Sequence, residues 1–190
     1  MAEKVRCEWC LKTPTYIKYH DEEWGVPVHD DKKLFEFLVL ESFQAGLSWL
    51  IILNKRENFR RAFKNFDPVK VSKFTRVNFN SLIKDVGIIR NKLKIEAAIN
   101  NAKRFLEIQK EFGSFDKYVW SFVKNKTIIN KNKTMKDYVS KSQISDSMSE
   151  DMGRRGFKFR GSTICYAFMQ AVGMVNDHLV SCFRYKELTK

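Results

Sequence analysis

Residues that could bind a metal ion occur near both ends of the sequence. His178 and Cys182 are four residues apart, which on a helical turn would place both side chains on one face. Cys7 and His20 lie in the N-terminal segment and could complete a tetrahedral zinc site of two sulfurs and two imidazoles. Because the protein would fill all four positions, this zinc would be structural and would join the two ends of the chain.

Two other residues could take part in that site. Cys10 follows Cys7 by three residues, and these two cysteines with His178 and Cys182 have an equally plausible spacing. His29 is also available as a ligand. The spacings favour a metal site but do not choose among these sets of ligands.

A second group of residues could bind a flat ligand with a polar edge. Glu41 shares a helical face with Leu34 and Phe37, so its carboxylate projects from an apolar stripe. A buried carboxylate is costly unless it meets a cation or several donors, and buried unpaired acids are often functional. The aromatic residues that could surround it are Trp9, Tyr16, Tyr19 and Trp49. A pocket for a flipped nucleobase requires such rings and one carboxylate. The alternatives are a salt-bridged structural glutamate and an ordinary aromatic core.

A third feature is the glycine-containing turn between two expected helices. A glycine can take positive φ, and the amides after it would then point outward at the start of the next helix. Such amides could bind a DNA phosphate, with basic side chains on either side. An ordinary helix C-cap is the alternative interpretation. The residues of this predicted anion site are Gly87, Ile88, Ile89, Arg90 and Lys92.

The net charge favours a polyanionic partner. The chain has 35 basic and 22 acidic residues, which gives +13 and a pI near 9.6. Nucleic acid is the first expectation and an anionic membrane surface the second. We expect no membrane span, because no apolar run reaches about 18 residues. The N-terminus lacks the apolar stretch of a secretory signal, so we expect a cytoplasmic protein whose cysteines are thiols or metal ligands.

The elements that must position these residues are mostly helices, and the expected class is all-α. We expect one domain over residues 1–190, formed by two helical lobes. The segments expected to be irregular or weakly ordered are 1–31 and 124–151, and the latter carries no usable motif. Thr127–Ile129 is too short to seed a sheet. The expected helices are two between 31 and 66 joined near Gly46, short ones at 69–74 and 79–86, an amphipathic one bearing Ile95 to Leu106, and two at 115–123 and 163–172.

In its ordered blocks the chain resembles the type I 3-methyladenine DNA glycosylases of the helix-hairpin-helix superfamily. The resemblance runs from Cys7 to about Cys182, nearly the whole chain. It departs from the family pattern at Ser42 and Phe43 and is poor over 124–151. The blocks that carry it are Tyr19–Pro27, Gln44–Trp49, Lys55–Asn58, Phe66–Val71, Gly87–Arg90, Val119–Val123, Arg155–Phe159, Cys165–Tyr166 and Val175–His178.

The resemblance implies a helix-hairpin-helix glycosylase fold with a zinc-stapled N- and C-terminal region. Segments 1–31 and 174–190 would form the zinc-binding part. The resemblance also selects among the candidate ligands, and it sets Cys10 and His29 aside. The implied ligands of one structural zinc ion are Cys7, His20, His178 and Cys182.

The resemblance further implies how the site acts. Glu41 and Tyr19 would hydrogen-bond the alkylated base, while Trp49 stacks on it and Trp9 and Tyr16 line the pocket. The step from Gly46 to Leu47 would approach the gap left in the duplex, and the hairpin at Gly87 would hold the phosphate backbone. The partner implied is double-stranded DNA that contains alkylated adenine, and we expect a monomer.

The expected reaction is hydrolysis of the glycosidic bond of 3-methyladenine, which is base-excision repair that leaves an abasic site. Alkylation at N3 makes the base cationic, so an ionised Glu41 in a low-dielectric pocket would favour it over neutral adenine. No lysine is placed for lyase chemistry, so we expect a monofunctional enzyme. The competing hypothesis is a zinc-stapled DNA-binding module without catalysis, which has no need of a buried acid facing aromatic rings. An RNA-binding or membrane-surface protein has only the net charge in its favour.

Overall fold

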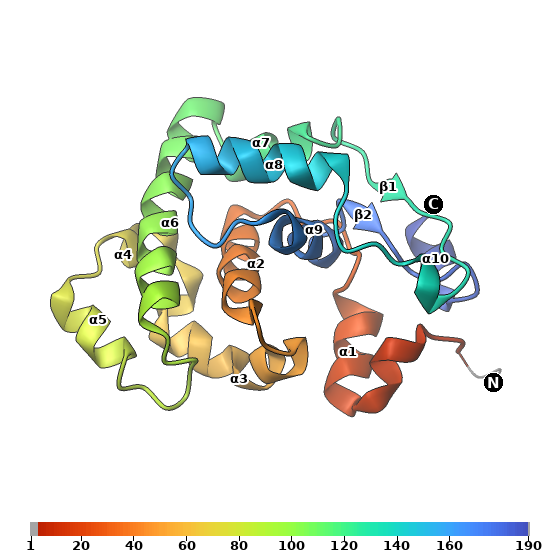
Figure 1. Cartoon of the computed structure of the whole chain (residues 1–190), viewed down its shortest axis with the longest axis horizontal. Helices are drawn as coiled ribbons and strands as arrows, with labels where there is room; N and C mark the ends of the chain where they lie inside the picture. The colour runs from red at the N-terminus through yellow and green to blue at the C-terminus, as the bar shows by residue number, and fades with distance from the viewer. Residues whose placement is uncertain (1–3, 190) are drawn as a thin grey trace.

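The computed structural model describes residues 4–189, which fold mainly into helices (Figure 1). The predicted zinc-binding segments include residues 1–3 and 190, which lie outside the described residues. The α-helices are α1 (Pro14–Glu22), α2 (Asp31–Gln44), α3 (Trp49–Ala62), α4 (Pro68–Ser72), α5 (Arg76–Leu82), α6 (Lys92–Phe112), α7 (Phe115–Ser121), α8 (Gln143–Arg154), α9 (Ser162–Ala171) and α10 (Phe183–Leu188). Short 3-10 turns occur at η1 (Glu8–Lys12), η2 (Lys64–Phe66) and η3 (Met135–Asp137).

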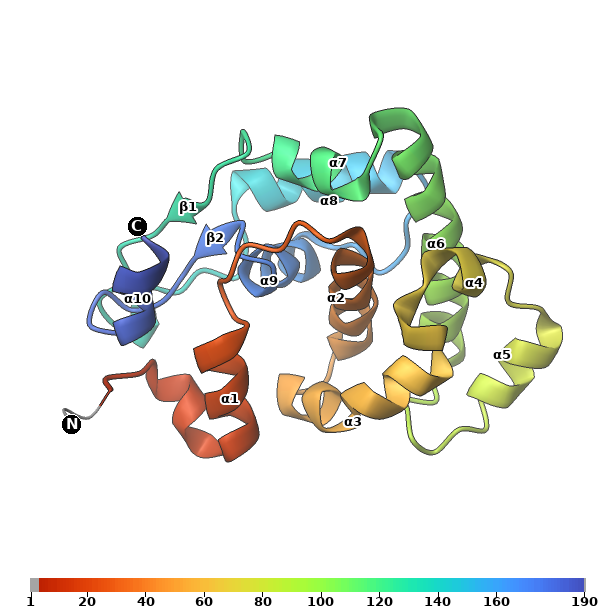
Figure 2. The same cartoon turned by 180° about the vertical axis from the view of Figure 1, so that it is seen from behind.

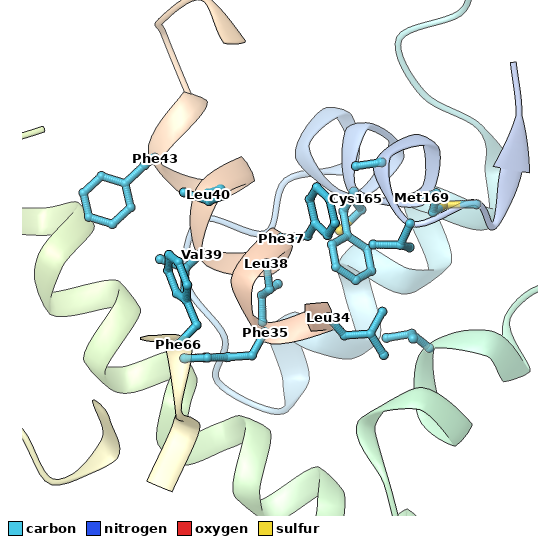
Figure 3. Packing of buried hydrophobic residues seen from close by; sticks show 14 of the residues in the cluster. Leu34, Phe35, Phe37, Leu38, Val39, Leu40, Phe43, Phe66, Cys165 and Met169 are labelled. Carbon is cyan, nitrogen blue, oxygen red and sulfur yellow. The ribbon is translucent and has the colours of Figure 1, made fainter. Parts of the chain in front are cut away.

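Helix α2 is the centre of the core. Ten successive residues, from Leu34 to Phe43, are buried, so this helix is enclosed on all sides and not only along the apolar stripe. Its neighbours include α3, α6, α7 and α9. Figure 3 shows its side chains pointing in all directions, with Cys165 and Met169 of α9 on one side and Phe66 on another. The side chain of Asp30 caps the helix by accepting a hydrogen bond from the amide of Lys33 at 2.8 Å.

The two ends of the chain lie on the same side of the molecule. Both views show α1 close to α10, while α4, α5 and α6 lie at the opposite end (Figures 1 and 2). Within residues 4–189, none of the helices combines the length and the apolar character needed to cross a membrane. The mostly helical class predicted from the sequence is confirmed.

Within residues 4–31 the N-terminal segment is partly helical, which corrects the sequence prediction of an irregular segment. It forms η1 and α1, and the reason lies in the residues that begin α1. The Thr13 hydroxyl accepts a hydrogen bond from the amide of Tyr16 at 3.2 Å, and Pro14 occupies the first helical turn. The sequence pattern did not indicate α1, because its aromatic residues lie on several faces and show no helical period.

Segment 124–151 is also more regular than predicted. It contains η3, most of α8, and the strand β1 (Ile128–Ile129), which pairs in parallel with β2 (Val175–Asn176). Ser142 caps α8, whose buried face carries Met148 and Met152. A strand of two residues cannot be recognised locally, because its partner lies 47 positions further along the chain.

The end of α5 and the start of α9 also differ from their predicted positions. Helix α5 ends at Leu82 rather than near Val86, so the turn before α6 is longer than predicted. Helix α9 begins at Ser162, one residue before the predicted start, and the Ser162 hydroxyl pairs with that of Ser145 at 2.8 Å. Gly161 holds the N-cap position.

Candidate active site and metal centre

A cavity of about 310 Å³ lies between α1, α2, α9 and the start of α3. The sequence predicted five base-binding residues, and all five side chains line this cavity. They are Trp9, Tyr16, Tyr19, Glu41 and Trp49. The Glu41 carboxylate and the four aromatic rings, which are separated in the sequence, therefore face the same cavity.

Glu41 is a buried acid that has no charged partner within residues 4–189. Glu41 is 4% exposed, and its Oε2 atom has no hydrogen-bond partner among the described residues. Burial raises the pKa of Glu41 to about 8. At pH 7 the empty cavity therefore holds this carboxyl group largely in its protonated form. A cation placed in the cavity would favour the ionised form.

Glu36, on the same helix, shows what a structural glutamate looks like in this protein. It is also buried, but Oε1 accepts hydrogen bonds from Arg56 Nε at 2.7 Å and from Arg60 Nη2 at 2.8 Å. The salt-bridged alternative considered for Glu41 is thus realised five residues earlier. Glu41 differs from Glu36 because it faces aromatic rings instead of cations.

The aromatic residues form a connected wall. The ring of Tyr19 lies 5.6 Å from that of Trp49, and the ring of Trp9 lies 5.5 Å from that of Tyr16. The Tyr16 hydroxyl accepts a hydrogen bond from the amide of Leu50 at 3.0 Å, which joins α1 to the first turn of α3 beside Trp49. Burial, followed by the charge of Glu41, holds the pKa of the Tyr19 hydroxyl well above its usual range, so this hydroxyl stays a donor.

Six further residues line the cavity that the sequence analysis did not select. Met135 and Tyr138 come from the segment in which no motif was found, and no local signal marks them. Gln170 had a usable signal, because it lies on the same helix face as Ala167. The full set of missed lining residues is Trp24, Gln44, Met135, Tyr138, Ala167 and Gln170.

The turn between α2 and α3 is held from α6. Gly46 has a φ of +76°, which suits glycine, and Leu47 after it is 37% exposed. The ammonium group of Lys94, buried at the start of α6, donates to the carbonyls of Phe43 at 2.8 Å and Ala45 at 2.5 Å. A lysine at a helix C-terminus satisfies carbonyls that lack helical partners. Sequence reasoning missed this residue.

The turn before α6 differs from its prediction. Gly87 does not have positive φ. A Cβ there would lie 2.9 Å from Oδ1 of Asp85 and 3.1 Å from Cγ of Asn58, so a larger residue would force a shift at this close approach. Lys55 holds this turn from α3 by donating to the carbonyl of Val86 at 3.0 Å and to that of Gly87 at 3.3 Å.

Fewer amides are free in this turn than the sequence suggested. The amide of Gly87 donates to Asp85 Oδ1 at 2.7 Å, and Ile88 is buried with its amide directed to the Asp85 carbonyl at 3.4 Å. The amides of Ile89 and Arg90 have no partner within residues 4–189. Two amides, with the exposed side chains of Arg90 and Lys92, therefore remain available to an anion.

Four buried cysteine and histidine side chains meet where the ends of the chain come together. They are Cys7, His20, His178 and Cys182, and their ligand atoms lie within 4.8 Å of one another. Around a tetrahedral zinc ion, ligand atoms at the usual bond lengths would lie about 3.3–3.8 Å apart. The separations from His178 Nδ1 are 3.2 Å to His20 Nε2, 3.6 Å to Cys182 Sγ and 3.7 Å to Cys7 Sγ. The donor set and its spacing fit a zinc ion.

Outer hydrogen bonds direct both imidazoles toward the centre of this cluster. His178 Nε2 lies 3.0 Å from the carbonyl of Trp24, and His20 Nδ1 lies 2.8 Å from Oδ1 of Asp21. Each of these nitrogens must carry the hydrogen, because its partner only accepts. The lone pairs of His178 Nδ1 and His20 Nε2 therefore face each other, an arrangement that a metal ion stabilises.

The other candidate ligands lie outside the cluster. The Cys10 thiol donates to the carbonyl of Cys7 at 3.1 Å, and His29 is a surface residue paired with Asp116 at 2.8 Å. One expectation is corrected here. Residues 178–182 form a non-helical loop, with α10 beginning only at Phe183, so a turn of the loop brings the two ligands together.

The cluster and the cavity share a wall. The ring of Trp24 lies 4.6 Å from that of His178, and the ring of Trp9 lies 5.6 Å from that of His20. Both tryptophans also line the cavity. Any group that fixes the cluster therefore also fixes one side of the cavity.

The chain matches a known protein family and known proteins over most of its length. A family model described as methyladenine glycosylase matches residues 9–185. The chain is 48% identical to DNA-3-methyladenine glycosylase 1 of Escherichia coli over 95% of this chain and 96% of that protein. It is 44% identical to DNA-3-methyladenine glycosylase of Haemophilus influenzae over 94% and 96%.

Solved structures with the same fold carry related descriptions. A crystal structure of 3-methyladenine DNA glycosylase I superposes with a TM-score of 0.92 at 45% identity, covering 94% of this chain and 98% of that one. The enzyme of that name from Staphylococcus aureus, described for its recognition of 3-methyladenine, superposes with a TM-score of 0.91 at 37% identity, covering 94% and 95%.

Proposed function

Because this chain belongs to the methyladenine glycosylase family, we propose that it is a DNA-3-methyladenine glycosylase of base-excision repair. It hydrolyses the bond between the alkylated base and its sugar and leaves an abasic site in double-stranded DNA. The observation that carries this function is Glu41, a buried acid with no cation beside it, in a cavity walled by aromatic rings.

In this proposal the base is recognised by stacking and by charge. Trp49 stacks on the flipped base, Tyr19 and Glu41 hydrogen-bond it, and Trp9 and Tyr16 close the remaining sides. Stacking accepts any base, so selectivity for an alkylated adenine comes from the carboxyl group. A neutral base gains nothing from ionising Glu41, whereas a cationic base pairs with the carboxylate.

Bond cleavage then follows from the charge already on the base. When a cationic base enters, Glu41 gives up its proton to solvent and its carboxylate pairs with the base. The electron pair of the breaking glycosidic bond passes to the base, which leaves as a neutral molecule, and the positive charge moves to the sugar. Water adds to the sugar carbon and loses a proton. Glu41 therefore acts as a charge-selective contact and is not required as a proton donor.

The DNA-binding part of the proposal involves two turns. Gly46 and Leu47 approach the gap that the flipped nucleotide leaves in the duplex. Helices α5 and α6 with the turn between them form the helix-hairpin-helix element, where Gly87 and Ile88 shape the turn. The amides of Ile89 and Arg90 bind a phosphate there, with Lys92 beside them.

We also propose one structural zinc ion held by Cys7, His20, His178 and Cys182. When bound, it supplies no chemistry to the reaction, because the protein fills all its coordination positions. It holds the two chain ends together within a single glycosylase domain. We expect this domain to act as a monomer.

The decisive experiment is incubation of the protein with methylated double-stranded DNA, scored for free 3-methyladenine and for abasic sites. We expect release by the wild type and its loss, by about 100-fold or more, in Glu41→Gln. A folded, zinc-loaded wild type that releases no base would instead favour the non-catalytic DNA-binding module.

The matched control carries the same charge change far from the cavity. Glu107→Gln alters an exposed acid of α6 that pairs with Arg104, and this variant should excise at the wild-type rate. DNA affinity should be equal in both variants. If Glu41→Gln excises as fast as Glu107→Gln, Glu41 has no part in recognition of the base.

A further inference from the structure

Gln170 is a polar residue that lines the cavity and has no assigned part in binding the base. It lies on α9 three residues after Ala167, and both side chains line the cavity from the same helix face. Helix α9 packs against α2, the helix that carries Glu41. The cavity therefore receives Glu41 and Gln44 from α2 and Gln170 from the packed helix α9.

The amide group of Gln170 is held in one orientation by Asp177. This aspartate is 1% exposed, and its carboxylate is surrounded by hydrogen-bond donors. Gln170 Nε2 donates to Oδ2 at 2.7 Å, and the Tyr166 hydroxyl donates to the same oxygen at 2.9 Å. Nδ2 of Asn130 and Nδ2 of Asn132 donate to Oδ1 at 2.6 and 3.1 Å.

This hydrogen-bond network allows only one orientation of the Gln170 side-chain amide. The Tyr166 oxygen already accepts from Asn130 Nδ2 at 3.2 Å, so its hydrogen is directed to Asp177. A reversed Gln170 amide would place its oxygen against the carboxylate, which repels it. Oε1 is therefore turned away from Asp177, and the only hydrogen bond of the Gln170 side chain within residues 4–189 is the one that Nε2 donates. Oε1 is a fixed acceptor on a residue that lines the cavity.

Fixed acceptors distinguish adenine from guanine. Adenine carries a 6-amino donor, while guanine carries an oxygen acceptor at the same position. We propose that Gln170, positioned by Asp177, is a specificity-determining residue that accepts a hydrogen bond from the 6-amino group of the alkylated base. This inference rests on the proposed function. Bases with an oxygen at that position leave two acceptors facing each other and are disfavoured.

The test compares two ligands in two proteins. Free 3-methyladenine and 3-methylpurine, which lacks the 6-amino group, are titrated against the wild type and Gln170→Met, with tryptophan fluorescence as the readout. We expect the wild type to bind 3-methyladenine about tenfold more tightly than 3-methylpurine. In Gln170→Met this preference should fall to near one, because methionine keeps the length of the side chain but cannot accept from the amino group.

Gln44→Met is the matched control, because Gln44 lines the same cavity and has no such carboxylate holding its amide among the described residues. The control should keep the tenfold preference. The inference is overturned if the preference does not fall in Gln170→Met, or if Gln44→Met lowers it equally. A wild type that binds neither ligand and releases no base would contradict the proposed function itself, so the two failures are distinguishable.

Discussion

Two glutamates on one helix show how the surroundings of a residue decide its role. Glu36 and Glu41 are both buried on α2, and the sequence places both among apolar residues. Glu36 meets the guanidinium groups of Arg56 and Arg60 and is a structural ion pair. Glu41 meets no cation, so its burial is left uncompensated until a ligand supplies the charge.

This difference predicts how stability depends on pH. Burial raises the pKa of Glu41 to about 8, against an ordinary value of 4.5. Below pH 4.5 both folded and unfolded states hold the proton. As pH rises to 8 only the unfolded state releases it, so the folded state loses stability across this window. Glu41→Gln cannot ionise and should be more stable than the wild type at pH 8, by about 2–5 kcal/mol.

Urea denaturation at pH 5 and at pH 8 measures this effect. The gain from Glu41→Gln should be small at pH 5 and large at pH 8. The control Glu107→Gln should give no comparable difference between the two pH values. A gain that is equal at both pH values would mean that Glu41 titrates near its ordinary pKa in the folded protein.

At the scale of elements, the two turns proposed to contact DNA are both held by lysines from neighbouring helices. Lys94 of α6 binds carbonyls at the end of α2, and Lys55 of α3 binds carbonyls of the turn before α6. These lysines are used in holding the backbone. The positions of the turn at Gly46 and the turn at Gly87 are thereby linked through α3 and α6.

Lys94→Met should destabilise the protein by about 1–3 kcal/mol, because two buried carbonyls lose their donor. It should also slow base excision, since the turn bearing Leu47 loses its anchor. Urea denaturation and single-turnover excision measure the two effects. Lys103→Met, an exposed change on the same helix, should alter neither. Wild-type stability in Lys94→Met would show that water replaces the ammonium group at no cost.

Gly87→Ala should weaken DNA binding while leaving the base cavity intact. The added methyl group meets Asp85 and Asn58, so the turn before α6 must shift. We expect at least a tenfold loss of affinity for duplex DNA by fluorescence anisotropy and unchanged binding of free 3-methyladenine. Gly161→Ala is the control, since a Cβ there meets nothing within 4 Å. Unchanged DNA affinity in Gly87→Ala would argue against this turn as the phosphate site.

At the scale of the whole molecule, the two chain ends together build one side of the candidate active site. Cys7 and His20 from one end meet His178 and Cys182 from the other. The rings of Trp9 and Trp24 pack on these histidines and line the cavity. A metal ion at the cluster would stabilise the fold and shape the cavity at the same time.

Cys182→Ala should therefore lower zinc content and thermal stability together. Cys10→Ala is the matched control, because Cys10 is equally buried but its thiol donates to the backbone carbonyl of Cys7 and is not one of the four clustered ligand atoms. We expect one zinc per chain by elemental analysis in the wild type and in Cys10→Ala, and much less in Cys182→Ala. Equal zinc content in all three proteins would exclude Cys182 as a ligand.

The sequence by itself determined the features that rest on local patterns and on long matching blocks. The buried helix around Glu41, the break at Gly46 and the family followed from apolar periodicity, a glycine and ordered motifs. Helix α1 was missed because its aromatic residues serve a cavity and a metal cluster rather than one helical face. Strand β1 was missed because it exists only through pairing with β2.

Only the tertiary structure decided which distant residues share a space. Spacing left Cys10 and His29 open as ligands, and the structure directs both away from the cluster because other partners hold them. Tyr138 reaches the cavity from a segment with no motif, and Gln170 reaches it from a helix that was predicted without any site residue. The pKa of Glu41 likewise depends on everything packed around it, which no single stretch of sequence contains.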